Sequence, residues 1–65
     1  MPRVPKVREV LADLQRDGWY LVKSKGGHRQ LKHPVKTGRV TLSGNPGDDV
    51  YEKTLRSIYR QAGLK

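Results

Sequence analysis

The residues with the clearest chemical potential lie together in one short stretch, Lys25 to Pro34. His28 directly follows two glycines in this stretch, and an imidazole can take up or release a proton near neutral pH. Glycines let a backbone approach a ligand closely, and the lysines and arginines around them attract phosphate. These residue types at this spacing indicate a phosphate-bearing polymer held against a candidate general base.

The positive charge of the chain is concentrated around that stretch. The 65 residues carry a formal net charge of +8, and the six acids fall into two clusters, so that no acid occurs from Gly18 to Gly47. A basic segment of this kind is typical of a nucleic-acid surface, and a basic surface that serves only solubility is the alternative reading. The segment contains the residues that we expect to contact nucleic acid, namely Lys23, Lys25, Gly26, Gly27, Arg29, Lys32, Lys36 and Arg39.

Five secondary-structure elements are predicted to position these residues. An apolar stripe with helical spacing runs through residues 6–17, and a second one runs from residue 51 or 52 to residue 62. Between them, the Gly26-Gly27 pair predicts a two-residue hairpin turn. Strands are expected at residues 19–25, 28–33 and 39–43. The order α-β-β-β-α predicts an α+β fold in which two helices cover one face of a three-stranded antiparallel sheet.

Alternation along the second strand predicts where its side chains point. Leu31 is the one large apolar residue of this strand, so we expect it to face the helices. By parity, His28, Gln30 and Lys32 then share the open face of the sheet. His33 stands before a proline at the end of the strand, and we expect a structural role for it.

Length and composition restrict the class of protein. Sixty-five residues predict one domain, residues 1–65, with a thin core. The chain has no cysteine, and its two histidines lack the neighbouring carboxylates of a zinc site, so we expect neither a metal nor another cofactor. No apolar run is long enough to span a bilayer, and residues 1–6 lack the apolar segment of a signal peptide. We therefore expect a cytoplasmic protein that does not bind membranes.

Five short motifs follow one another along nearly the whole chain. They are Gly18-Trp19 after the first helix, Lys25 to His28 at the turn, His33-Pro34, Gly38 to Thr41, and Thr54 to Leu64. No single motif is specific, but the ordered set in so short a chain resembles the HicA toxins. These proteins, also called YcfA-like proteins, are small ribonucleases of toxin–antitoxin modules.

The resemblance implies a fold similar to double-stranded RNA-binding domains and an endoribonuclease activity toward mRNA, with His28 as the catalytic residue. It also implies a protein partner, a HicB-like antitoxin that covers the active site. Two positions depart from the family pattern. Gly27 stands where the family usually has a serine, and Asn45 stands where it often has another histidine.

The chemistry expected of His28 uses the 2′-hydroxyl of RNA as the nucleophile, with the imidazole as its general base and without a metal. Two other classes of protein fit the same charge pattern. One is a non-catalytic RNA-binding module of the same fold, which would leave RNA intact. The other is a DNA-binding regulator, although neither predicted helix combines a basic face with the base-reading residues of a helix-turn-helix.

Overall fold

The computed structural model describes residues 4–64. Residues 1–3 and 65, which include both ends of the expected domain and the start of the N-terminal stretch, lie outside the described residues. The elements are α1 (Val7–Arg16), β1 (Tyr20–Lys25), β2 (His28–Lys32), β3 (Val40–Ser43) and α2 (Glu52–Gln61). The predicted order α-β-β-β-α is confirmed, and the element boundaries lie within one residue of those expected.

Helix α1 forms because its apolar residues fall on one stripe. Val7, Val10 and Leu14 are at most 1% exposed and pack into the core. The chain leaves the helix at Gly18, whose φ of +109° lies in a region that side chains rarely adopt. A Cβ atom at this position would lie 2.7 Å from Nε2 of His33. Both the backbone conformation and the close neighbour therefore require glycine.

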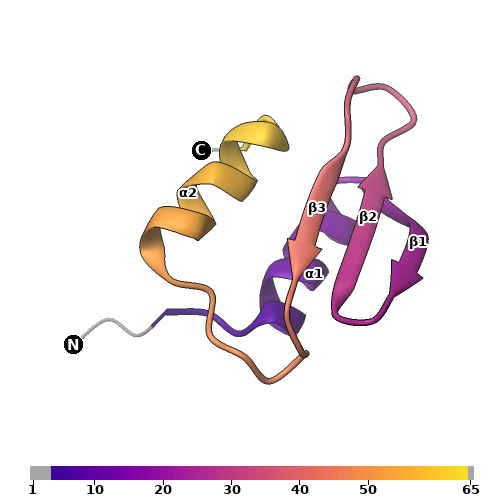
Figure 1. Ribbon diagram of the computed structural model, residues 1–65. Helices are drawn as coiled ribbons and strands as arrows, with labels where there is room; N and C mark the ends of the chain where they lie inside the picture. Colours follow the sequence, from indigo (N-terminus) through magenta and orange to yellow (C-terminus); the bar gives the residue numbers. More distant parts are fainter. Residues whose placement is uncertain (1–3, 65) are drawn as a thin grey trace.

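The three strands form an antiparallel sheet in the order β1-β2-β3, shown in Figure 1. The Gly26-Gly27 turn joins Lys25 to His28, and these two residues are paired across the hairpin. Gly26 takes the positive φ of +58° that such a tight turn needs. The register between β1 and β2 shifts at Val22, which is a β-bulge.

Both helices cover the same face of the sheet (Figure 1), and the core lies between them and that face. Trp19 is 1% exposed and is one of the largest side chains in the core. The hydroxyl of Tyr59 on α2 donates to Asp13 Oδ2 on α1 at 3.0 Å, which joins the two helices directly. Within residues 4–64, neither helix has the length and apolar character needed to cross a bilayer. The core is made of Val7, Val10, Leu14, Trp19, Leu31, Val40, Leu42, Val50, Ile58 and Ala62.

Candidate functional site

The open face of the sheet is defined by alternation along β2. Leu31 is fully buried beneath the helices, so the residues on either side of it in the strand point the other way. His28, Gln30 and Lys32 therefore lie on the open face, and the side chain of His28 is exposed as predicted. Because β2 is the central strand, His28 has neighbours on both sides.

A β-bulge in β1 adds two lysines to this face. The register pairs Leu21 with the buried leucine of β2, skips Val22 and then resumes with Lys23. After the bulge, Lys25 lies directly opposite His28. Residues directly opposite each other share a face, so both lysines join His28 on the open side. Without the bulge, strict alternation would place them on the same face as Leu21.

Strand β3 supplies a hydrogen-bond partner for His28. Ser43 lies opposite His28 in the register, and its Oγ is 3.0 Å from Nδ1 of the imidazole. When the hydroxyl accepts from Nδ1–H, the lone pair of the neutral ring is on Nε2, where it can accept a proton. Sequence reasoning missed Ser43 because the long connection between β2 and β3 does not fix their register. The available signal was its parity with Thr41, two residues earlier on the solvent side of β3.

The other end of the open face is also positively charged. Arg39 Nη1 donates to Gln30 Oε1 at 2.9 Å, so the guanidinium lies over the sheet, and Lys32 is exposed beside it. Among residues 4–64, none of the ion pairs involves Lys23, Lys25 or Lys32. The acids that are ion-paired belong to the helices and to the segments that flank them. We refer to Lys23, Lys25, His28, Lys32 and Arg39 as the cationic face.

Arg29 points away from the cationic face and supports the loop after β3. Its Nη1 donates to the carbonyl oxygen of Gly44 at 2.7 Å, and the side chain is half-buried. The N–H of Gly44 in turn donates to the carbonyl oxygen of Gly27 at 2.7 Å. Gly26 and Gly27 therefore stay next to His28, whereas Arg29 does not join it. A Cβ atom at Gly27 would lie 3.7 Å from the Gly44 nitrogen, an ordinary contact, so a serine would fit there.

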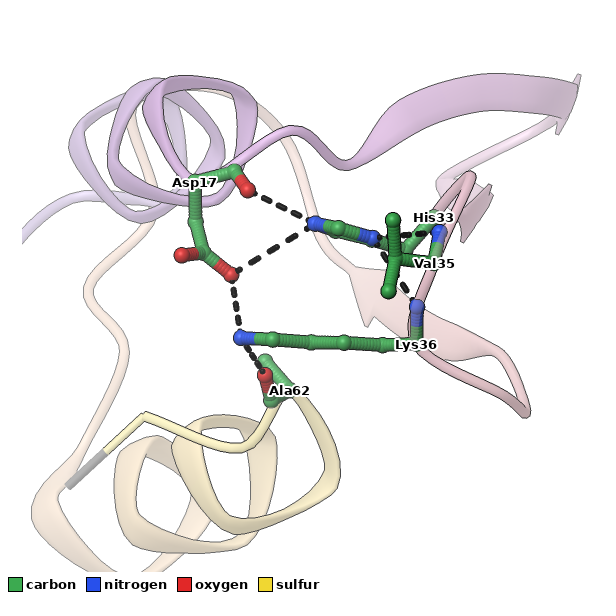
Figure 2. Close-up of polar contacts among 5 residues, drawn as sticks. All are labelled: Asp17, His33, Val35, Lys36 and Ala62. Carbon is green, nitrogen blue, oxygen red and sulfur yellow. Dashed lines mark hydrogen bonds and ion pairs between the residues drawn. The ribbon is translucent and has the colours of Figure 1, made fainter.

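Lys36 also lies outside the cationic face, in a cluster at the ends of the two helices (Figure 2). Its ammonium group is 2.6 Å from Oδ2 of Asp17 and donates to the carbonyl oxygen of Ala62 at 3.0 Å. The hydrogen bond from Lys36 holds the pKa of the Asp17 carboxyl below its ordinary value. Lys36 thus joins the end of α1 to the end of α2.

The second histidine is part of the same structural cluster (Figure 2). His33 Nε2 donates to the backbone oxygen of Asp17 at 2.7 Å, and Nδ1 accepts from the N–H groups of Val35 and Lys36 at 3.0 and 3.1 Å. This pattern requires the hydrogen on Nε2, because Nδ1 must be an acceptor. The side chain is 9% exposed, and its ring packs edge-on against Trp19 at 5.3 Å. The structural role predicted for His33 is confirmed.

The fold and the cationic face define a small α+β protein whose exposed sheet surface suits a polyanion. Within the described part of the chain, no three His, Asp or Glu side chains are grouped so as to hold a metal ion. Residues 7–64 match the family described as the HicA toxin of bacterial toxin–antitoxin systems. The chain therefore belongs to the HicA toxin family, as the sequence motifs indicated. No curated protein matches the chain in a sequence comparison.

Membership in this family carries two consequences. The chain has the role of the toxin in a toxin–antitoxin pair, and an antitoxin is its partner. The match covers every element from α1 to α2, so it includes the whole cationic face.

Proposed function

We propose that this toxin is an endoribonuclease that cleaves mRNA in the cytoplasm, with His28 as its catalytic residue. The observation that carries the proposal is the setting of His28, which is exposed on the central strand between Lys25 and Ser43. An imidazole with a fixed hydrogen-bond partner, on a surface that attracts phosphate, has what a metal-independent ribonuclease needs.

The proposed reaction begins with the 2′-hydroxyl of RNA. With Ser43 accepting from Nδ1–H, Nε2 of His28 takes the proton of that hydroxyl as its oxygen attacks the neighbouring phosphorus. The bond between phosphorus and the 5′-oxygen then breaks, and the departing oxygen takes up a proton from water or from His28. The products are a 2′,3′-cyclic phosphate and a 5′-hydroxyl. Proton transfer of this kind contributes roughly 10²- to 10⁴-fold to a rate.

The lysine nearest to His28 has a different role in this proposal. Lys25 lies directly opposite His28, and the Cβ atoms of such pairs are about 4.5–5.5 Å apart. Its flexible ammonium group can stabilise the negative charge that builds on the phosphoryl oxygens during attack. Lys23, Lys32 and Arg39 lie further along the sheet, where they would bind the neighbouring phosphates of the same strand.

We further propose that the antitoxin is HicB-like and silences the toxin by covering the cationic face. The net charge of +8 favours an acidic partner surface, because complementary charge speeds association and fixes orientation. An antitoxin bound in this way would separate His28 from RNA without altering the fold. Binding measured at rising salt concentration, with and without RNA as a competitor, tests whether the two ligands share this face.

The test of the enzymatic proposal is incubation of the protein with a defined mRNA, comparing wild type with His28→Ala. Wild type should cleave, and the variant should lose about 10²-fold or more of the rate while it keeps its fold and RNA affinity. Arg60→Ala is the matched control, because it removes one exposed charge from α2, away from the sheet. Full activity in His28→Ala would remove His28 from the reaction. RNA that binds wild type but stays intact would instead identify a binding module.

A further inference from the structure

A cleft of about 130 Å³ lies beside the cationic face, between β3 and the start of α2. One wall is formed by Thr41 and Ser43 of β3, and the other by Thr54 in the first turn of α2. Asp49 and Tyr51, from the segment that joins the two elements, also line the cleft. Buried core residues form the remainder, so the cleft has an apolar base and a polar margin.

The position of the cleft relative to His28 is fixed by one residue. Ser43 lines the cleft and is also the hydrogen-bond partner of the imidazole, at 3.0 Å. The cleft and the proposed reaction centre therefore share Ser43. On an RNA strand with its scissile phosphate at His28, a group bound in the cleft would be the base of an adjacent nucleotide.

Tyr51 is a large aromatic side chain for which the fold gives no packing role. Its side chain is 68% exposed, whereas Trp19 and Ile58 are almost fully buried. It lies at the N-cap of α2 with an extended backbone, and the residue lines the cleft. Exposed aromatic rings beside a basic groove are the usual platforms on which the bases of single-stranded nucleic acid stack.

The carboxylate of Asp49 at the cleft margin constrains which base would bind. Asp49 lines the cleft, and its Oδ1 is held by the ammonium of Lys6 at 2.5 Å. A carboxylate repels phosphate but accepts hydrogen bonds from an amino group, as acidic side chains do from N4 of cytosine. Uracil presents a carbonyl oxygen at the same position, which a carboxylate disfavours.

We propose that this cleft is a base-binding subsite, in which Tyr51 stacks on a nucleobase and Asp49 accepts from its amino group. The inference rests on the proposed function, because it takes RNA as the ligand of the neighbouring face. It assigns to these two residues a preference for cytosine over uracil at a nucleotide next to the cleaved bond.

The experiment measures the binding of short oligocytidylate and oligouridylate to the His28→Ala protein, which keeps both strands intact. The parent should bind oligocytidylate at least about fivefold more tightly. Adding Tyr51→Ala should weaken binding of oligocytidylate by about 5- to 150-fold, and Tyr51→Phe should restore it, because phenylalanine keeps the stacking surface. Adding Asp49→Asn should abolish the preference, because an amide can pair with either base.

The controls separate this inference from loss of folding and from the proposed function. Val35→Ala, at a side chain that is 83% exposed between β2 and β3, should bind both strands like the parent, and thermal melting should be similar for all variants. If the parent and Tyr51→Ala each bind oligocytidylate and oligouridylate equally well, the inference is overturned, even where wild type cleaves mRNA through His28. A cytosine preference that depends on Tyr51 would support the inference even where wild type cleaves nothing.

Discussion

The salt dependence of RNA binding gives a quantitative test of the cationic face, and Lys32→Ala is the most informative change. Lys32 is exposed, is at the opposite end of β2 from His28, and has no ion pair within residues 4–64. Its replacement therefore removes one charge from the face without disturbing the core or the proposed reaction centre. Lys32→Ala should weaken RNA binding and leave the structure unchanged.

The number of cations on the face sets the expected salt dependence of RNA binding. The face carries four cations, namely Lys23, Lys25, Lys32 and Arg39. Each phosphate neutralised on a single strand contributes about −0.7 to the slope of log affinity against log salt, so four contacts give a slope of about −2.8. Between 50 and 200 mM salt, this slope corresponds to a loss of affinity of roughly 50-fold. Lys32→Ala should reduce the slope to about −2.1 and the loss to roughly 18-fold.

The assay is fluorescence anisotropy of a labelled single-stranded RNA in the His28→Ala background, repeated across that range of salt. Arg60→Ala provides the matched control, since it lowers the net charge equally but lies on α2. Screening over a Debye length of about 8–10 Å leaves that distant charge with little effect on the slope. A slope unchanged by Lys32→Ala, or changed as much by Arg60→Ala, would refute the assignment of the cationic face.

Three further predictions concern positions outside that face. Lys36 holds the pKa of Asp17 below its ordinary value of 3.8. The ion pair therefore stabilises the fold above pH 3.8, and this stabilisation is lost as the pH falls through the lower folded-state pKa. The free energy of unfolding, measured across acid pH, should show this loss in wild type and not in Asp17→Asn. Gly18→Ala should lower the melting temperature markedly, because its Cβ atom would lie 2.7 Å from His33 Nε2 at a φ of +109°. Gly27→Ser should melt close to wild type, because its Cβ atom meets only ordinary contacts.

Much of the fold followed from local patterns in the sequence. The stripe of Val7, Val10 and Leu14 specifies α1 whatever the tertiary contacts are, because amphipathic helices are read from spacing alone. The single large apolar residue of β2, Leu31, was enough to orient the whole strand and to expose His28. The glycine pair at 26–27 fixed the register at the hairpin, because a two-residue turn leaves one way to pair its flanking residues.

The parts that the sequence left open depend on contacts between distant segments. The sequence placed Lys36 among the expected nucleic-acid contacts, and its ammonium group is held by Asp17 and by the carbonyl oxygen of Ala62 at the end of α2. Arg29 is likewise committed to the loop after β3, and no pattern within β2 reveals that partner. Ser43 became visible only when β2 and β3 were aligned. Tertiary contacts therefore decide whether such a polar side chain faces solvent, supports the fold or joins the candidate site.

The bulge in β1 is the clearest case of a feature that local pattern hides. Tyr20, Leu21 and Val22 are all apolar, so alternation could not assign a face to the strand. The bulge at Val22 separates the parity of Leu21 from that of Lys23, and it thereby brings two lysines beside His28. The unpaired residue Val22 therefore places two lysines of the candidate site on the open face.

His28 is proposed to remove the proton of a ribose 2′-hydroxyl, and RNA that lacks this hydroxyl at the cleaved bond tests that role. Once the cleaved bond in a defined RNA has been mapped, the same RNA is prepared with a single 2′-deoxy nucleotide immediately 5′ of that bond and incubated with wild type. We predict that this bond then stays intact, while the all-ribose strand yields a 2′,3′-cyclic phosphate end. Cleavage of both strands at the same rate would rule out attack by the 2′-hydroxyl and with it this role of His28.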